Sequence, residues 1–378
     1  MAVAALRSGG LQSGCVSRRR RRRTAQAATD HSSSSTTLNL VFAGAVWLIT
    51  GSLLFCCSCV VAAESKAAAA AATVRPDVAL QTGFYQTSCP QLQDIVSSVV
   101  ARHVRKDPTS GAPLVRLFFH DCAVNGCDAS VLIDSTPNNT AEKDAVPNLT
   151  LAGFNVISDI KSEVEASCPN IVSCADIIAL AAKDAVAQQG GPNWIVELGR
   201  RDGVVSSAAE ATDLLPSSHS NAQSLIATFA TLNLTSQDLV ALSGAHTFGR
   251  AHCTEVARRF YGINSTTGMD PTLSAKYGEM LRSLCPLPLS PTATVPLDPV
   301  TPNAFDKVYY TDLLQGRGLM SSDAGLVADP QTAPIVLEYS HSKAVFFEQF
   351  ATSMIKLGRV GMPLGSEGQV RRNCSAVN

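Results

Sequence analysis

The segment from Leu114 to Asp134, LVRLFFHDCAVNGCDASVLID, holds the densest set of chemically active side chains in the sequence. Arg116 and His120 are four residues apart, so on a helix their side chains lie on one face. A histidine can take up and return a proton, and a neighbouring arginine can stabilise negative charge on a leaving group. The spacing fits a histidine at a helix end, capped by Asp121, equally well, so both interpretations stay open.

A candidate cation-binding loop follows His120 directly. Two carboxylates, a hydroxyl, a glycine and two cysteines lie close together: Asp121, Cys122, Gly126, Cys127, Asp128 and Ser130. Such oxygen atoms, with the carbonyls of a glycine-containing turn, are the ligands that calcium prefers. A turn rich in aspartate that binds no ion is the alternative.

His246 lies in a second dense segment, DLVALSGAHTFG, which runs from Asp238 to Gly249. Its neighbours are small or apolar, so a metal ligand and a histidine satisfied within the core both fit this setting. Further along, Asp298, Thr301 and Asp306 lie within nine residues. They are another candidate set of oxygen ligands.

Helical periodicity dominates the elements that must position these residues. After Cys89, apolar residues recur at spacings of three and four, which is typical of an amphipathic helix: Leu92, Ile95, Val96, Val99 and Val100. Similar stripes predict helices over Phe154–Val164, Ile177–Val186, Leu225–Leu232, Val256–Tyr261 and Phe346–Leu357. Ser173 with Asp176, and Thr235 with Asp238, have the spacing of capping boxes at helix starts. Strand alternation is scarce, so we expect one mainly α-helical domain over residues 73–378.

Residues 1–72 are predicted to be a targeting extension and are excluded from the fold. Six arginines, Arg18 to Arg23, precede an almost uncharged apolar run from Leu40 to Ala63. A basic region, an apolar region and small residues near Ala62–Ala63 are typical of a cleaved secretory signal. The apolar run is also long enough to span a bilayer, so a retained membrane anchor stays open. Of the two we expect cleavage, giving a secreted, soluble protein that starts between Glu64 and Gln81.

Charge and cysteine content agree with an exported protein. The chain carries 30 Lys and Arg against 31 Asp and Glu, but residues 1–72 hold eight of the basic residues and two of the acidic ones. The remainder is therefore acidic, which argues against nucleic acid as a partner. Eight of the twelve cysteines lie beyond residue 72 and include no CxxC pair, so disulfides are favoured over a thiolate zinc site. Sequons at Asn138, Asn233 and Asn264 fit a glycoprotein.

Taken together, the motifs resemble those of the secretory plant peroxidases, the class III haem peroxidases. The resemblance covers residues 80–378, and the motifs occur in family order: RLFFHDC, NGCDAS, EKDAVPN, SCADIIAL, GRRDG, LSGAHTFGRAHC, DPVTPNAFD and GLMSSD. It implies an all-α haem-peroxidase fold, with one haem b between distal and proximal helices, two calcium sites and four disulfides. It also implies a monomer of the cell wall that reduces hydrogen peroxide and oxidises small phenolic donors, with roles in peroxide removal, lignin and wall phenolic oxidation and oxidative stress.

The resemblance assigns the peroxide side of the haem site. His120 would be the distal base and Arg116 the distal cation, with Phe119 packed over the haem. Asn148 would orient His120 by a hydrogen bond. Asn148 also begins a sequon, but a glycan is incompatible with that role, and we expect the hydrogen bond.

The resemblance likewise assigns the opposite side. His246 would be the proximal iron ligand, and Asp323 would accept its other ring N–H and make the imidazole electron-rich. Pro216 matches a family position that helps to bind aromatic donors.

Two calcium sites and four cysteine pairs are also implied by the resemblance. The first site would use Asp121, Asp128 and Ser130, the carbonyls of Val124 and Gly126, and Glu142 through water. The second would use Thr247, Asp298, Thr301, Asp306 and the carbonyl of Ala304. The pairs would be Cys89–Cys168, Cys122–Cys127, Cys174–Cys374 and Cys253–Cys285. Because Thr247 adjoins His246 in sequence, the second ion would steady the iron ligand.

Some positions depart from the family pattern and leave the donor specificity open. Ala123 stands where the family motif usually has phenylalanine, and Leu297 occupies a place near the proximal histidine that is aromatic in some members. Val146, His219 and Glu255 replace aromatic residues that line the substrate entrance in some relatives. A calcium-binding wall protein with a dead peroxidase site is a competing class, but it would need the loss of a haem-site residue. A histidine-based metallohydrolase would need clustered ligands of the HExxH kind, which the sequence lacks.

Overall fold

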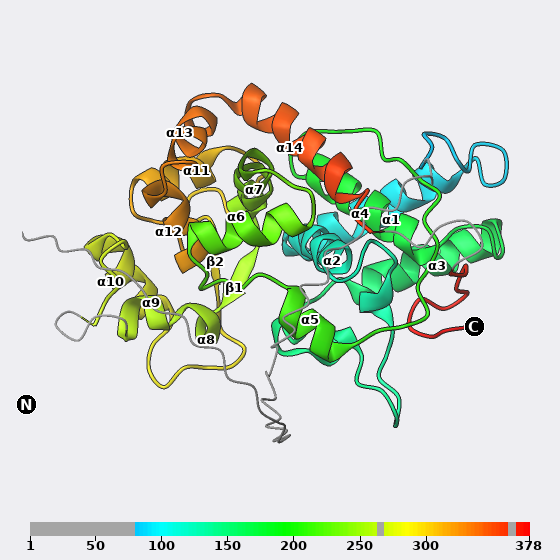
Figure 1. The fold of residues 1–378 in the computed structure, drawn as a ribbon, viewed down its shortest axis with the longest axis horizontal. Helices are drawn as coiled ribbons and strands as arrows, with labels where there is room; N and C mark the ends of the chain where they lie inside the picture. The colour runs from blue at the N-terminus through cyan, green and yellow to red at the C-terminus, as the bar shows by residue number, and fades with distance from the viewer. Residues whose placement is uncertain (1–79, 263–267, 362–367) are drawn as a thin grey trace, which may run out of the picture. The chain divides into compact units, whose positions relative to one another are not determined.

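The computed structural model describes residues 80–262, 268–361 and 368–378, all within one compact unit that spans Ala67–Asn378. The targeting prediction for residues 1–72, the boundary after it and the sequon at Asn264 lie outside the described residues. The described part is mainly helical (Figure 1), which confirms the predicted fold class.

Several connections between the helices are long, among them residues 124–153, 189–207 and 285–307. The first group comprises α1 (Leu92–Lys106), α2 (Gly111–Ala123), α3 (Phe154–Ser167), α4 (Cys174–Gln188), α5 (Ala208–Leu214), α6 (Ala222–Thr231) and α7 (Ser236–Ser243). The second comprises α8 (Cys253–Val256), α9 (Arg258–Tyr261), α10 (Ala275–Leu284), α11 (Val308–Leu314), α12 (Ser321–Ala328), α13 (Ala333–His341) and α14 (Lys343–Leu357). Short 3₁₀ turns occupy Pro108–Ser110, Ser130–Leu132, Glu142–Asp144, Val146–Asn148 and Gly244–Thr247.

One antiparallel ribbon joins β1 (Arg250–His252) to β2 (Thr294–Pro296), with Ala251 opposite Val295. β1 begins four residues after His246, so the ribbon fixes the backbone that leaves this histidine. The scarcity of strand patterns in the sequence agrees with this short sheet.

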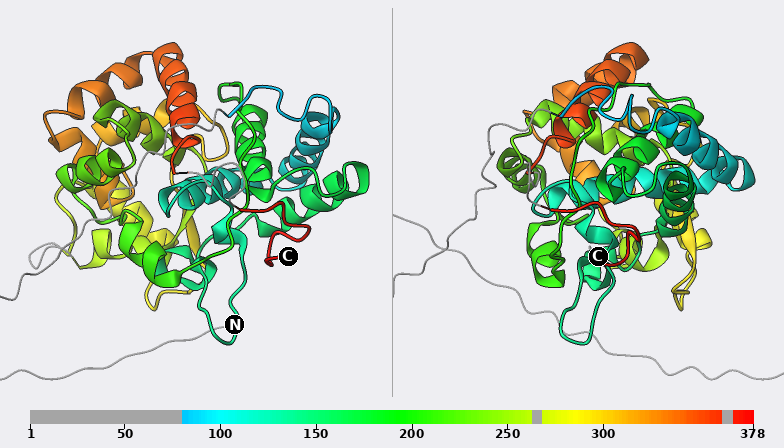
Figure 2. Two further views of the ribbon diagram at one scale, coloured as in Figure 1. Left: turned by 45° about the vertical axis from the view of Figure 1, so that its right-hand side comes forward. Right: turned by 90° about the vertical axis from the view of Figure 1, so that its right-hand side faces the viewer.

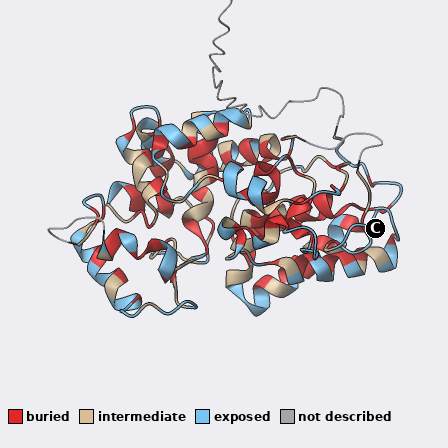
Figure 3. Cartoon of the chain, turned by 60° about the horizontal axis from the view of Figure 1, so that its bottom comes forward, coloured by how far each residue is buried: buried red, intermediate tan, exposed pale blue. Residues whose placement is uncertain are grey.

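The core forms where the apolar stripes of the helices meet. α2 and α1 pack on α4, α7 packs on α14, and α11 packs on α13; Figures 1 and 2 show α1–α4 on one side and α11–α13 on the other. The predicted stripe of α1 is buried at Leu92, Val96, Val99 and Val100. Buried positions lie along the inner sides of the helices and exposed ones along the outer sides (Figure 3).

The capping residues at two helix starts were predicted correctly, but the extent of one helix was not. Ser173 accepts a hydrogen bond from the amide of Asp176 at the start of α4, and Thr235 and Asp238 form a reciprocal capping box at the start of α7. The stripe over Val256–Tyr261 was wrong as one helix: α8 ends at Val256, and α9 begins at Arg258. Periodicity cannot detect this break, because the apolar side chains on both sides of it enter the same cluster.

Four disulfides staple the unit, and the four predicted pairs are confirmed: Cys89–Cys168, Cys122–Cys127, Cys174–Cys374 and Cys253–Cys285. Two of them close long segments, of 79 and 200 residues, and so restrict the unfolded chain.

Among the described residues no single helix is long and apolar enough to span a membrane. One pair of helices, Ala222–Thr231 with Ser236–Thr247, is long and apolar enough when taken together, but the pair is bent by 107°.

Candidate active site

Arg116 and His120 lie on the same face of α2, as their spacing predicted. The Nε of Arg116 donates to the Nε2 of His120 over 3.2 Å. The rest of the guanidinium is held by the loop after α2: it donates to both oxygens of Thr150 at 3.0 Å and to the carbonyl of Pro147 at 2.9 Å. Arg116 therefore has a fixed position beside the histidine.

Asn148 fixes the other ring nitrogen of His120. Its Oδ1 lies 2.6 Å from the Nδ1 of His120, and its Nδ2 donates to the carbonyl of Glu142 over 2.8 Å. An amide oxygen only accepts, so the proton of a neutral His120 resides on Nδ1 and its Nε2 keeps a lone pair. With both amide atoms engaged and Asn148 only 2% exposed, no room remains for a glycan on this residue.

The pKa of His120 is low for two physical reasons. Burial lowers it, and the positive charge of Arg116 lowers it further, to about 3, although the hydrogen bond to Asn148 opposes the shift. Burial also lowers the pKa of Arg116, while the negative charge of the exposed Glu255 raises it. His120 is therefore a neutral base over the whole physiological range.

Phe119 lies beside this pair and is partly exposed. Its ring is stacked on Phe229 and meets His120 edge-on, with the centroids 6.0 Å apart in each case. Phe119 therefore presents an apolar surface next to the base.

His246 lies in the 3₁₀ turn Gly244–Thr247, directly after α7. Its Nδ1 is 2.8 Å from the Oδ1 of the buried Asp323, at the start of α12. Tyr309 donates to the same oxygen over 2.8 Å. The side chain of His246 is 35% exposed, and no described residue forms a hydrogen bond with its Nε2. This nitrogen thus has a free lone pair and a ring orientation fixed by a carboxylate.

Two glycines allow the close packing of this turn. A Cβ on Gly244 would lie 2.3 Å from the Oη of Tyr310, and one on Gly249 would lie 2.7 Å from the Cβ of Ala112 on α2. The second approach places the backbone after His246 against the first turn of the helix that carries His120. No direct contact joins the two histidines within the described residues.

The residues of the first predicted calcium site gather under the end of α2. Both carboxylate oxygens of Asp121, Oε2 of Glu142 and Oγ of Ser130 are buried without a well-formed hydrogen bond. Burial raises the pKa of Asp121 and of Glu142, the latter to about 8, and the charge of Asp128 adds to both shifts. Gly126, at φ +119°, packs so tightly on Gly361 that a Cβ would overlap its carbonyl, and Val124 is buried beside it. Buried oxygens with unmet acceptor capacity fit a bound divalent cation.

The residues of the second predicted calcium site form two separate hydrogen-bonded pairs. Thr247 donates to Asp306 over 3.2 Å, and Thr301 donates to Asp298 over 3.1 Å, with Ala304 in the turn that follows Thr301. Asp312, which the sequence reasoning missed, has a buried, unpaired carboxylate oxygen, and burial raises its pKa to about 6. Among the described residues no three His, Cys, Asp or Glu side chains form a metal cluster by themselves.

Pro216 lies in the connection between α5 and α6 and is partly exposed, without a hydrogen bond to Arg116 or His120. Val146, which replaces an aromatic residue of some relatives, is 76% exposed two residues before Asn148. An exposed aliphatic side chain therefore lies close to Asn148 in the sequence.

Comparison with known proteins agrees with the geometry. A sequence-family model described as "Peroxidase" matches residues 96–342. The chain is similar to Peroxidase 3 of Arabidopsis thaliana, with 48% identity over 301 residues that cover 79% of this chain and 92% of the relative. It is also similar to Peroxidase 73 of Arabidopsis thaliana, at 45% identity over 79% of this chain and 92% of the relative, and to Peroxidase 5 of Vitis vinifera, at 44% over 81% and 94%.

Proposed function

This chain belongs to the peroxidase family, and from that premise we propose that it is a secreted haem enzyme that reduces hydrogen peroxide and oxidises small phenolic donors. The observation that carries the proposal is that two histidines, His120 and His246, have different surroundings. His120 is buried, neutral and fixed by an amide, whereas His246 is anchored to a carboxylate and keeps one nitrogen free.

His246 fits an iron ligand. A ligating histidine usually donates its other ring N–H to a carboxylate, which fixes the ring and raises its basicity. Asp323 takes that role here, and Tyr309 fixes Asp323 in turn. When bound, one haem b supplies the redox chemistry.

His120 and Arg116 fit the proton chemistry of peroxide cleavage. The lone pair on Nε2 of His120, which here accepts from Arg116, would take the proton from one peroxide oxygen and return it to the other. That second oxygen would leave as water when the O–O bond breaks, with the electrons supplied by the bound haem. Arg116, held by Thr150 and Pro147, stabilises the negative charge that develops on the leaving oxygen. Asn148 keeps the tautomer that leaves Nε2 basic. Phenolic donors would approach near Phe119 and Pro216.

Two calcium ions are part of the proposal. The unpartnered oxygens of Asp121, Ser130 and Glu142 support the first site. For the second, Thr247 both contacts Asp306 and adjoins His246, so an ion there would steady the iron ligand.

An absorption spectrum and one assay test the proposed activity. We expect the secreted protein to show a Soret band, and to oxidise a simple phenol such as guaiacol only when hydrogen peroxide is present. Heat-inactivated protein with the same haem content is the control. Purified, folded protein that neither retains added haem nor consumes peroxide would contradict the proposal.

We further propose that the enzyme is released outside the cell, into the wall space. Four disulfides fit an oxidising compartment, and the sequence before residue 73 is typical of a secretory signal. N-terminal sequencing of enzyme washed from cell walls should give a start between Glu64 and Gln81. Activity found only in a detergent-extracted membrane fraction, with Leu40–Ala63 still attached, would contradict cleavage.

A further inference from the structure

The C-terminal segment Gly368–Asn378, here called the strap, brings a cation to the buried carboxylates of Asp121, Asp128 and Glu142, here called the acidic cluster. Arg371 on the strap is fully buried, and its Nη2 donates to the carbonyl of Ala129 over 2.6 Å. Ala129 lies between Asp128 and Ser130, in the loop proposed to bind calcium. We propose that Arg371 is a positioning residue that holds the loop Gly126–Ser130 from the strap and thereby slows release of the ion. The inference rests on the calcium site proposed above.

The burial of Arg371 requires compensation, because an unpaired charge inside a protein is costly. Its Nε and Nη1 have no hydrogen-bond partner, so hydrogen bonding alone does not supply this compensation. Burial lowers the pKa of Arg371, and nearby carboxylates oppose this in part: Asp202, which lies 3.9 Å from Nε, and Asp121, Asp128 and Glu142. The guanidinium therefore belongs to the electrostatics of the acidic cluster.

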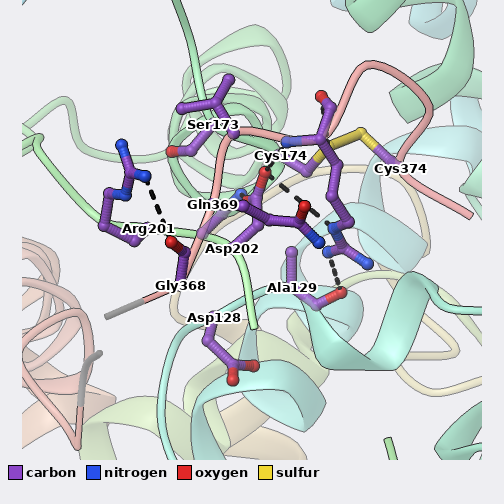
Figure 4. Close-up of polar contacts among 12 residues, drawn as sticks. Asp128, Ala129, Ser173, Cys174, Arg201, Asp202, Gly368, Gln369 and Cys374 are labelled. Atoms are coloured by element: carbon purple, nitrogen blue, oxygen red, sulfur yellow. Dashed lines mark hydrogen bonds and ion pairs between the residues drawn. A yellow bond between two sulfur atoms is a disulfide. The ribbon is translucent and has the colours of Figure 1, made fainter. Parts of the chain in front are cut away.

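The strap itself is anchored away from the loop. The backbones of Asp202 and Gln369 exchange two hydrogen bonds, of 2.8 and 2.9 Å. One carboxylate oxygen of Asp202 accepts from the amide of Arg371 over 2.8 Å, and the other accepts from the amide of Ala175 in α4 over 2.9 Å. The Cys174–Cys374 disulfide ties the end of the strap to the same helix (Figure 4). Arg371 is thus held by a backbone pairing, a buried carboxylate and a disulfide that lie outside the loop.

The loop, by contrast, has an unusual backbone that needs external support. Ala129 adopts a left-handed φ of 59°, which is unfavourable for a residue with a Cβ. The amide of Gly203 donates to the carbonyl of Asp128 over 2.7 Å, next to the bond from Arg371 to Ala129. Two successive carbonyls are therefore held from outside the loop, and Arg371 supplies one of these bonds.

Removing Arg371 would have two opposite effects on a bound cation. Loss of a positive charge would favour binding, and loss of the hydrogen bond would free the loop. The lost charge acts from outside the proposed ligand set, whereas the lost hydrogen bond frees the carbonyl of Ala129, which lies between the proposed ligands Asp128 and Ser130. Loss of the backbone support then dominates, and the ion should leave faster.

The test measures calcium directly in the full-length secreted holoenzyme. We expect Arg371→Met to release one calcium ion to a fluorescent chelator at least about tenfold faster than the wild type, in line with the effect of other outer-shell contacts on metal sites. Hydrogen exchange should rise at the amides of residues 126–130. Arg371→Lys, which keeps the charge and one donor, should lie between the two.

Arg372→Met is the matched control. Arg372 is the next residue, but it is exposed and its Nε donates to Asn170 on the surface. It should release calcium at the wild-type rate.

The outcomes separate this inference from the proposed function. A wild type that contains no calcium by elemental analysis would overturn the calcium site itself. A wild type with calcium and an Arg371→Met variant that releases it equally fast, or more slowly, would overturn only the role of Arg371. If Arg371→Met does not fold, Arg371→Lys decides: faster release supports the role, and an unchanged rate overturns it.

Discussion

Replacing His120 by alanine should lower the rate of reaction with hydrogen peroxide by about 10²–10⁴-fold or more, the contribution usual for a positioned acid–base group. The basic Nε2 is lost, so no group beside Arg116 can take the peroxide proton and return it. His246 and Asp323 lie on other elements, so bound haem and its Soret band should remain. The measurement is the stopped-flow change in haem absorbance after mixing with peroxide.

His103→Ala is a matched control, because His103 is paired with Asp159 between α1 and α3, away from the site. It should react with peroxide at the wild-type rate. A His120→Ala variant that reacts within about threefold of the wild type, well below the acid–base range, would exclude the role given to His120.

The pH profile of the wild type gives a second check on the same residue. With a folded-state pKa of about 3, His120 stays neutral and its base form is fully present well below pH 6. The rate with peroxide should therefore be flat from pH ~7 to ~4, and a rate that falls with a midpoint at the ordinary histidine pKa of ~6.5 would contradict it.

The low pKa of His120 also affects stability, in the direction opposite to that of a salt-bridged histidine. The unfolded chain binds a proton at this residue near pH ~6.5, and the folded chain does not until the pH approaches 3. The free energy of unfolding should therefore fall as the pH drops from ~6.5 towards 3.

Local signals in the sequence predicted much of the fold, and contacts between distant residues limited the rest. The capping boxes at Ser173 and Thr235 depend on residues three apart, so they can be identified from the sequence. The acceptors that fix Arg116 lie more than 30 residues away, at Pro147 and Thr150, and no pattern in their neighbourhood marks them. The cysteine pairs came from the family resemblance, since eight cysteines allow many pairings.

Arg371 and Arg372 show this limit most directly. They are adjacent and chemically identical, yet Arg371 is fully buried in the acidic cluster and Arg372 is exposed. The burial of Arg371 depends on Asp202 and Ala129, which are 169 and 242 residues away. Tyr309 is a similar case: its bond to Asp323 completes the support of His246, but nothing in the sequence around it indicates a role in the site.

The two histidines also differ in how their surroundings set their chemistry. His120 is bound through Nδ1 to a neutral amide and is next to a cation, so its proton affinity is lowered. His246 is bound through Nδ1 to a carboxylate that the structure keeps buried, which makes its free nitrogen a stronger electron donor. The same side chain is thus prepared for proton transfer in one place and for metal ligation in the other.

Replacing His246 by alanine should abolish stable haem attachment, an effect larger than the ~10–100-fold loss usual for removal of an outer-shell partner. The iron would lose its protein ligand, while α7, α12 and the disulfides would keep the fold. The variant should lose its Soret band on gel filtration, and far-ultraviolet dichroism should stay unchanged. Added imidazole, which supplies the missing ring without its tether, should restore part of the band.

Asp323→Asn is the informative comparison, because it keeps His246 but weakens the bond that fixes its ring. It should retain haem and lose about 10–100-fold in the rate with peroxide, as expected when an outer-shell partner of a metal ligand is replaced. Tyr309→Phe removes only one donor to Asp323 and should have a smaller effect in the same direction. The graded order, with His246→Ala most severe and Tyr309→Phe mildest, follows from the distance of each group from the iron ligand. A His246→Ala enzyme that holds haem without imidazole would show that His246 is not the ligand, and an Asp323→Asn enzyme with wild-type rates would exclude the role given to Asp323.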